Sequence, residues 1–507
     1  MLRREPIYDP KSGEEVLEPL LFELGAAGRE GGYLPASPGA PSDADLPRAA
    51  RRAAPLDLPE LGEVDVIRHV THLAAMNHHL DRDLYPLGSC TMKHNPRVNE
   101  EIAALPGFAR LHPLQPEECA QGALSVLFDL ERILCAISGM DAFTLQPAAG
   151  AAGEFTGIAM VLAYHQARGE GRRRKVVVPD SAHGTNPASV ARLGAIPVEI
   201  KTGERGVLHP EQLEGVLDDE TAALMLTVPS TLGLFETHIR EIAARAHRSG
   251  AQLYLDGANL NALLGIVRPA DLGFDVMHIN VHKTFSTPHG GGGPGAGPVG
   301  VRTHLAPYLP GPRVARDGDG GDDGGVDRDR YRYRWEASGD ASVGRMHGFH
   351  GNFGILLRAY AFLRRHGAEG IREIGRTAIL NANYLQALLS KDFDLPQAGF
   401  CQHEFVLSGK NLRAHRVKTL DVAKRLLDYG FYAPTIYFPL IVPEALMIEP
   451  TETESKETLD RFAAALSAVA REARENPDLV RGAPHQTPVA RVDEGRAARD
   501  LDLAWGG

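Results

Sequence analysis

The stretch VMHINVHKTFSTPHGGGG, residues 276–293, decides the fold class of this chain. It runs from a short apolar segment to Lys283, and then through hydroxyl residues to four glycines. Desolvation of a lysine at a strand end among apolar neighbours favours the neutral amine, which can form a Schiff base. Glycines beside it let a ligand approach the backbone closely. The competing interpretation is a surface lysine at a strand end beside a flexible glycine loop.

Further apolar, β-branched runs precede this stretch and alternate with helical patterns. They are VVVPD (176–180), AIPVEI (195–200), ALMLTVPS (223–230) and QLYLDGAN (252–259), and VMHIN (276–280) closes the series. Nearly continuous apolar strands separated by helices are typical of a parallel sheet that is buried on both faces. The sequence therefore predicts an α/β fold with a mostly parallel sheet.

The rest of the chain divides around this sheet. Residues 311–333 are rich in Gly, Asp and Arg and are expected to form a surface loop. Beyond residue 370 the pattern predicts strands at 403–409, 437–442 and 445–450 and a long helix at 455–474. We expect an N-terminal arm at 1–60, a large α/β domain including a helical segment at 61–340, an interdomain helix at 341–370, a smaller C-terminal α+β domain at 371–475, and a C-terminal tail at 476–507.

Composition excludes several classes of protein. A net charge of -11 without a basic stripe argues against nucleic acid as a partner. The four cysteines are too few to staple 507 residues and form no C-x-x-C pair, which favours a reducing cytoplasm. The first residues lack the apolar core of a signal peptide, and no run of 18 apolar residues occurs. We expect a cytoplasmic protein without a membrane span.

Two further strand ends carry side chains that suit one cofactor. Asp256 ends the QLYLD run, where a carboxylate can keep the pyridine nitrogen of pyridoxal phosphate (PLP) protonated. His183 follows the VVVPD run, where an imidazole can stack on a planar ring and exchange protons with a substrate. The alternatives are a helix N-cap for Asp256 and a loop histidine bonded to the backbone for His183.

The segment LQPAAGAAGEFTG (145–157) places small residues at the start of a helix predicted at 153–165. Exposed amides at a helix N-terminus bind phosphate, although small residues there also serve tight packing. A phosphate loop, a ring-stacking histidine, a pyridine-binding aspartate and a Schiff-base lysine thus follow one another, each near a predicted strand end. A single PLP site explains all of them.

These and other segments resemble a known family. YPLGSCTMKHNP (85–96), SAHGTNPAS (181–189), DGANLNALLG (256–265), NVHKTFSTPHGGGGPG (280–295), GFHGNFGILLRAY (348–360) and IEPTETESKETLD (448–460) are similar to the glycine decarboxylase P-protein, and specifically to its separately encoded C-terminal-half type, subunit 2. The resemblance extends from about Asp65 to Phe462. It implies a PLP-dependent transferase of fold type I, the aspartate-aminotransferase type, that decarboxylates glycine and passes the aminomethyl group to the lipoyl arm of the H-protein.

The resemblance also assigns residues and partners. Lys283 would form the Schiff base, His183 would stack on the ring and Asp256 would bind its nitrogen. Ala149, Gly150, Ala258 and His282 would lie at the cofactor, and the first two and His282 near its phosphate. No metal site is expected. A P-protein subunit 1 would complete an α2β2 heterotetramer. His350 stands where the family pattern leads us to expect a tyrosine, which affects only the lining of the substrate channel.

Ser89, Cys90, Thr91 and Lys93 form a polar, turn-rich segment. We expect substrate-side contacts from this loop, with turn and capping roles as the alternative. Two rival functions share parts of the pattern. One is another fold type I amino-acid decarboxylase that simply protonates its product carbanion, and the other is a non-catalytic scaffold subunit, against which Lys283, Asp256 and His183 argue together.

Overall fold

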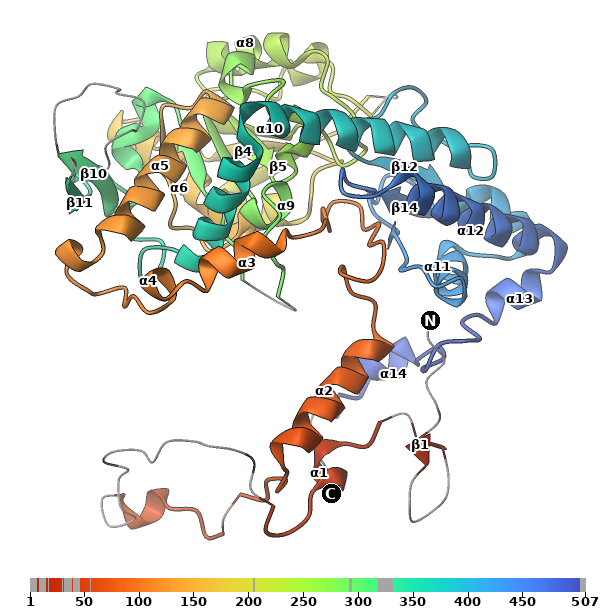
Figure 1. Ribbon diagram of the computed structural model, residues 1–507. Coiled ribbons are helices and arrows are strands. Elements are labelled where there is room, and N and C mark those ends of the chain that lie inside the picture. Colours follow the sequence, from red (N-terminus) through yellow and green to blue (C-terminus); the bar gives the residue numbers. More distant parts are fainter. Residues whose placement is uncertain are drawn as a thin grey trace. The chain divides into compact units, whose positions relative to one another are not determined.

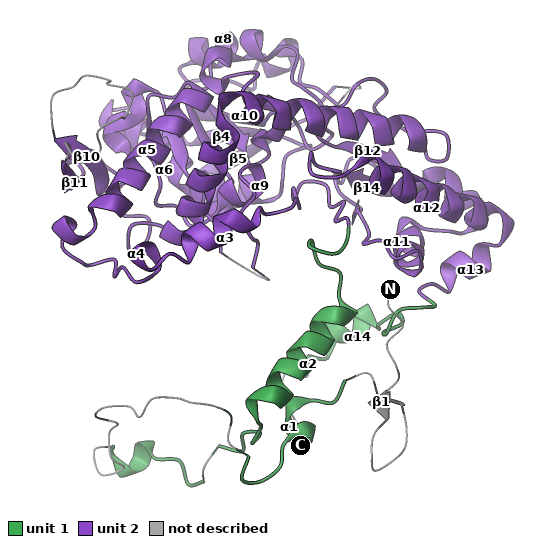
Figure 2. Ribbon diagram, viewed as in Figure 1, with its two compact units in different colours: residues 1–83, 485–507 green, residues 84–484 purple. Residues whose placement is uncertain are grey.

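The protein was analysed as a computed structural model, which describes residues 7–8, 15–16, 18–29, 31, 39, 46–54, 56–203, 206–290, 294–317 and 332–501. Two compact units are found, residues 1–83 with 485–507 and residues 84–484 (Figure 2). The first unit contains β1 (Ile7–Tyr8), β2 (Glu15–Val16), α1 (Leu21–Leu24), α2 (Glu63–Met76) and α14 (Glu494–Arg499). No helix within the described residues is long and apolar enough to span a bilayer.

A seven-stranded sheet forms the centre of the second unit (Figure 1). Its strands are β3 (Ala142–Thr144), β4 (Lys175–Pro179), β5 (Ile196–Ile200), β6 (Thr221–Thr227), β7 (Gln252–Gly257), β8 (Val276–Ile279) and β9 (Val299–Val301), in the order β3-β9-β8-β7-β6-β4-β5. Strands β4 to β8 are the five predicted from the sequence, and they pair in parallel. The short β9 runs antiparallel to β8 and to β3.

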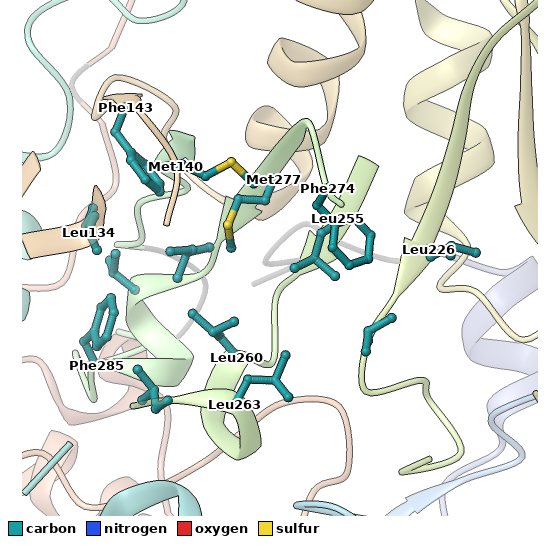
Figure 3. Close-up of a cluster of buried hydrophobic side chains, with 14 of the residues drawn as sticks. Leu134, Met140, Phe143, Leu226, Leu255, Leu260, Leu263, Phe274, Met277 and Phe285 are labelled. Carbon is teal, nitrogen blue, oxygen red and sulfur yellow. The ribbon is translucent and has the colours of Figure 1, made fainter. Parts of the chain in front are cut away.

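Alternate side chains of each central strand enter different cores. Leu253, Leu255 and Met277 pack into a cluster with residues of α5 (Gln121–Ser138), α8 (Ile239–Ser249) and α10 (Phe353–Leu389). Figure 3 shows part of this cluster. Tyr254 and Val276 instead join α6 (Gly150–Ala167) and α7 (Thr185–Arg192) in a second cluster. Both faces of the central strands are therefore buried, which explains their mainly apolar sequences, whereas most of the edge strand β5 is exposed.

A smaller antiparallel sheet lies in the C-terminal part of the same unit. Its strands, in the order β12-β14-β13, are β12 (Phe405–Ser408), β13 (Thr435–Ile436) and β14 (Ala445–Ile448). It shares a core with α11 (Thr419–Asp428), α12 (Lys456–Glu475) and α13 (Pro477–Arg481). The strand predicted at 437–442 is wrong. Tyr437 has a φ of 59°, and the Val442 amide donates to the Pro439 carbonyl, so this segment turns instead of extending.

Several other elements complete the second unit. Helices α3 (Arg97–Ala103), α4 (Pro106–Ala109) and the single-turn α9 (Val281–Thr284) also belong to this unit. The hairpin of β10 (Arg313–Asp317) and β11 (Arg332–Glu336) takes up both ends of the predicted loop at 311–333, and residues 318–331 lie outside the described residues. Helix α10 is 37 residues long and interrupted at Gly367, whose φ is 62°. The domain boundaries proposed from the sequence, at 60, 340, 370 and 475, stay a prediction.

Candidate active site

Lys283 lies on α9, the single turn that follows β8 directly. Its Nζ donates hydrogen bonds to the carbonyl of Ser89 at 2.6 Å and to Oδ1 of Asn259 at 3.0 Å. Ser89 precedes the large sheet in sequence, whereas Asn259 follows β7. The Lys283 side chain is half-buried, so its amine is held by hydrogen bonds and is still accessible to a ligand.

A cavity of about 250 Å³ opens beside this amine. Of the residues predicted from the sequence, it is lined by Ser89, Ala149, Gly150, His183, Asp256, Ala258, His282 and Lys283. They come from the carboxyl ends of β4, β7 and β8, from the start of α6 and from the segment before α3. Convergence at this edge is expected for a ligand site in an open α/β sheet.

Asp256 sits at the floor of the cavity with 3% of its surface exposed. Its Oδ2 accepts from Asn186 Nδ2 at 3.0 Å, and its Oδ1 accepts from the Ala258 amide at 3.0 Å. Burial acts to raise the pKa of Asp256, but the His278 imidazole and these hydrogen bonds outweigh it and leave the pKa below its ordinary value. The carboxylate is thus held ionised where a cationic ring nitrogen can meet it.

His183 has its side chain open toward the cavity, and its position is set by Thr185. His183 Nδ1 lies 2.9 Å from Thr185 Oγ1, and that hydroxyl donates to Glu154 Oε1 at 2.8 Å. The Thr185 backbone amide also donates to His183 Nδ1 at 3.2 Å, so Thr185 fixes the ring through both its amide and its hydroxyl. The ring also contacts Phe438 edge-on, with centroids 5.6 Å apart.

The start of α6 forms a cradle for an anion. The helix begins at Gly150, three residues earlier than predicted, and a Cβ at this glycine would lie 2.2 Å from Oδ1 of Asn280. Asn280 Oδ1 and His282 Nδ1 are buried polar atoms without a hydrogen-bond partner among the described residues. Burial lowers the pKa of His282 to about 3, with a further contribution from His289. Amides at the helix start and unpartnered polar atoms fit the phosphate of PLP.

The predicted substrate-side loop divides between two roles. Ser89 lines the cavity, while Thr91 and Lys93, both described, lie outside its lining. Thr91 bonds Glu449 with its amide and its hydroxyl. Lys93 Nζ bonds Glu452 at 2.7 Å and the carbonyl of Thr284 at 2.8 Å. Cys90 is partly buried, and burial raises the pKa of its thiol. Thr91 and Lys93 thus bond buried acids instead of lining the cavity, and the substrate-side contacts expected from this loop stay a prediction.

Sequence reasoning missed several polar residues here. Glu154, Asn259 and Glu404 line the cavity, and His403 contacts Asn259 through Nε2 at 3.2 Å. Glu404 and Glu449 are both fully buried. Burial and the neighbouring carboxylate raise the pKa of Glu404 well above its ordinary value, and burial raises that of Glu449 to about 7. Glu404 lies in the strand predicted at 403–409. The apolar pattern of that strand gives no sign that this glutamate reaches a cavity.

Comparison with known proteins now decides the family. Residues 40–323 match the family model described as glycine cleavage system P-protein, and residues 374–485 match that of the glycine dehydrogenase C-terminal domain. A Chlorobium chlorochromatii protein named probable glycine dehydrogenase (decarboxylating) subunit 2 is 54% identical, covering 96% of this chain and 99% of its own. The protein of that name from Caldanaerobacter subterraneus subsp. tengcongensis is 53% identical over 96% and 98%.

The chain belongs to the glycine cleavage system P-protein family. This confirms the resemblance inferred from the sequence, the enzyme class of the P-protein and its PLP cofactor. Among solved structures, a glycine decarboxylase (P-protein) in inhibitor-bound form has a TM-score of 0.71 at 23% identity, covering 84% of this chain and 93% of that one. A Lactobacillus brevis glutamate decarboxylase has a TM-score of 0.61 at 15% identity, over 85% and 96%. These likenesses confirm the predicted fold class.

Proposed function

We propose that this chain is the P-protein subunit that decarboxylates glycine and transfers the aminomethyl group to the lipoyl arm of the H-protein. The observation that carries the proposal is the presence of Lys283 and Asp256 in one cavity, at the carboxyl ends of neighbouring parallel strands. PLP bound there supplies an electron sink for the pair of electrons left when carbon dioxide departs.

Lys283 would hold the cofactor covalently through Nζ. Its hydrogen bonds to Ser89 and Asn259 orient the amine toward the cavity and occupy its protons. With its amine free of the cofactor, Lys283 would be held at these two acceptors. The backbone carbonyl and the amide oxygen thus give Lys283 a resting position within the same site.

Asp256 would bind the ring nitrogen and His183 would cover one face of the ring. A carboxylate ionised by its surroundings keeps the nitrogen protonated, which makes the ring a stronger electron acceptor. The Thr185 and Glu154 pair orients His183, whose exposed edge can pass a proton to or from the substrate. Gly150, with Ala149 and His282 beside it, would hold the phosphate.

The partner implied by the name of the relatives is a subunit 1, and we propose an α2β2 heterotetramer located in the cytoplasm. Support comes from α2, whose Val64, Ile67, Val70 and Leu73 are each more than 40% exposed. At this spacing the four side chains form a stripe that winds partly around the helix, with neighbours such as Ile67 and Val70 close together, and exposed apolar residues grouped in this way mark a contact surface. Only parts of the arm predicted at 1–60 fall within the described residues, and we propose that this Pro- and Gly-rich arm lies along the partner subunit.

Exchange of carbon dioxide into the glycine carboxylate tests the function. The rate is measured with the co-expressed subunits in the presence of lipoylated or unmodified H-protein. We expect exchange to depend on the lipoylated form, because the glycine α-carbon must be delivered to sulfur. Equal rates with both forms would favour a simple decarboxylase, and the absence of a PLP absorbance band would favour a scaffold.

A further inference from the structure

The turn at residues 87–91, which supplies the Ser89 carbonyl to Lys283, has an unusual backbone. Ser89 and Thr91 have φ angles of 65° and 47°, in the left-handed region that residues with a Cβ rarely adopt. Gly88 between Leu87 and Ser89 abuts β14, where a Cβ would lie 2.1 Å from Met447 Cγ. Such a conformation persists only where the surroundings impose it.

Two buried glutamates impose it. The Ser89 amide donates to Glu404 Oε2 at 2.6 Å. The Thr91 amide donates to Glu449 Oε2 at 3.0 Å, and the Thr91 hydroxyl to Glu449 Oε1 at 2.6 Å. Glu404 directly precedes β12 and Glu449 directly follows β14, so both acids come from the small antiparallel sheet. The turn is thus fixed at both left-handed residues by carboxylates from the distant C-terminal part of the unit.

The two acids have no cation dedicated to them. Among the described residues, neither forms an ion pair with a lysine or arginine; the His403 ring lies 3.6 Å from Glu404, the two acids lie beside each other, and the charge of Lys283 acts on both from beyond contact distance. Burying a carboxylate without a cation is unfavourable unless hydrogen bonds compensate it. Here the compensating donors belong mainly to the turn, with Asn261 Nδ2 also bonding Glu449 at 3.0 Å. Apolar residues would fill these positions at lower cost if packing were their purpose.

We propose that Glu404 and Glu449 are positioning residues for Lys283, which hold the 87–91 turn left-handed so that the Ser89 carbonyl meets the lysine amine. This inference rests on the proposed function of Lys283. A turn released to the right-handed conformation would rotate the carbonyl away, because adjacent peptide planes turn with φ. Lys283 would keep only Asn259 as an acceptor, and its amine would sample positions away from the cofactor aldehyde.

The test measures capture of the cofactor separately from turnover. Full-length chain co-expressed with its partner subunit is stripped of cofactor and mixed with PLP, and the covalent adduct at Lys283 is reduced with borohydride and quantified by mass spectrometry over time. Glu404→Leu removes the acceptor for the Ser89 amide, whereas Glu404→Gln keeps a carbonyl oxygen at the same distance. We expect capture to slow at least tenfold in the leucine variant and less than threefold in the glutamine variant.

Pyridoxine 5′-phosphate, which lacks the aldehyde, shows whether the cavity itself is intact. Glu404 also lines the cavity, so its substitution acts on analogue binding directly, but we expect the dissociation constant to change much less than the rate of capture in both variants because the analogue needs no lysine. Capture at the parent rate by Glu404→Leu, or equal loss of analogue binding and capture, would overturn the proposal. If the leucine variant does not fold, Glu404→Asp replaces it, since withdrawing the carboxylate by one methylene must slow capture in the same way. Neither measurement uses glycine or H-protein, so failure of the proposed function is seen separately, as a parent protein that captures PLP without decarboxylating glycine.

Discussion

Asp256 and His278 face each other across the parallel strands β7 and β8 as register partners, with Asp256 Oδ1 3.2 Å from His278 Nε2. On its other side His278 Nδ1 lies 3.0 Å from the hydroxyl of Tyr254, which is completely buried. The aspartate therefore has a polar support inside the sheet, behind the cavity it lines. This arrangement leaves the carboxylate little freedom to turn away from a ligand.

Substitution of Asp256 by asparagine is expected to lower glycine decarboxylation by about a thousandfold, since a neutral amide cannot keep the ring nitrogen charged and such electrostatic effects contribute several kcal/mol. Carbon dioxide release from the reconstituted enzyme measures the effect. Asp271→Asn is a matched control, because this carboxylate is half exposed and pairs with Arg268 outside the cavity. A loss of less than about tenfold would return Asp256 to a capping role.

Lys283→Ala is expected to abolish turnover and leave the thermal midpoint within a few degrees, because this lysine serves chemistry and, within the part of the chain that the structure describes, its amine bonds two oxygens. Lys93→Ala, in contrast, is expected to lower the stability of the protein. Its ammonium is buried against Glu452, and removing one partner of a buried pair costs about 3–5 kcal/mol. Calorimetry of both variants distinguishes them, and retained activity in Lys283→Ala would end the PLP assignment.

Gly150→Ala is expected to weaken binding of PLP at least tenfold. The added Cβ would meet Asn280 2.2 Å away at the first residue of α6, where the phosphate cradle requires close approach. Gly107→Ala is the control, because no heavy atom lies within 4 Å of a Cβ placed there. Titration of the cofactor-free protein with PLP gives both affinities. Equal affinities would show that the phosphate binds elsewhere.

The stability of the cofactor-free protein should depend on Glu449 between about pH 5 and pH 7. Burial raises the pKa of this carboxyl to about 7 from an ordinary 4.5, so within this window the folded chain holds a proton that the unfolded chain has released. Its contribution to stability is therefore complete below pH 4.5 and is lost as the pH rises to 7, by at most about 1.4 kcal/mol per pH unit.

Thermal midpoints of the parent and of Glu449→Gln, measured from pH 5 to pH 8, provide the test. The difference between the two proteins removes contributions common to both, including that of His403, whose pKa burial lowers to about 3. We expect the midpoint of the parent to fall more steeply with pH than that of the variant. Parallel curves would mean that Glu449 is ionised throughout.

The exposed face of α2 is expected to be needed for assembly with the partner subunit. Ile67→Asp combined with Val70→Asp places two charges on this face without touching a buried residue of the helix. We expect light scattering to show loss of the heteromeric mass, while the isolated chain keeps its helix content. Arg68→Glu, at an exposed polar position of the same helix, should assemble normally. Intact assembly in the double variant would move the interface to another surface.

Features with a local signal could be predicted from the sequence. Each strand of the parallel sheet is a mainly apolar run, and Asp256, His183 and Lys283 lie at or shortly after the ends of such runs, so their convergence could be expected from topology. The strand predicted at 437–442 had the same apolar composition, but Pro439 and the left-handed Tyr437 give it a turn. Apolar composition alone does not distinguish a strand from this turn, because it does not show which backbone groups form hydrogen bonds.

The residues that support Lys283 had no such signal. Glu404 bonds a backbone amide 315 positions away, and Glu449 bonds Thr91 across 358 positions. Asn259 lies three residues after Asp256, yet its role depends on Lys283 from the helical turn that follows the next strand. A glutamate in a strand-like segment is ordinarily a solvated residue. Only the folded chain shows that these acids are buried and which amides they bond.

The span between Thr91 and Glu449 also orders events during synthesis. The ribosome makes the turn early and its second anchor only at position 449 of 507, long after all seven strands of the large sheet have left the exit tunnel. A nascent or truncated chain can therefore form the sheet and carry Lys283 while the lysine still lacks its finished surroundings. The growing polypeptide thus contains Lys283 before it contains Glu404 and Glu449, the two residues that hold the turn beside the lysine. We expect the reactive amine to reach its final position only after both acids have been synthesised.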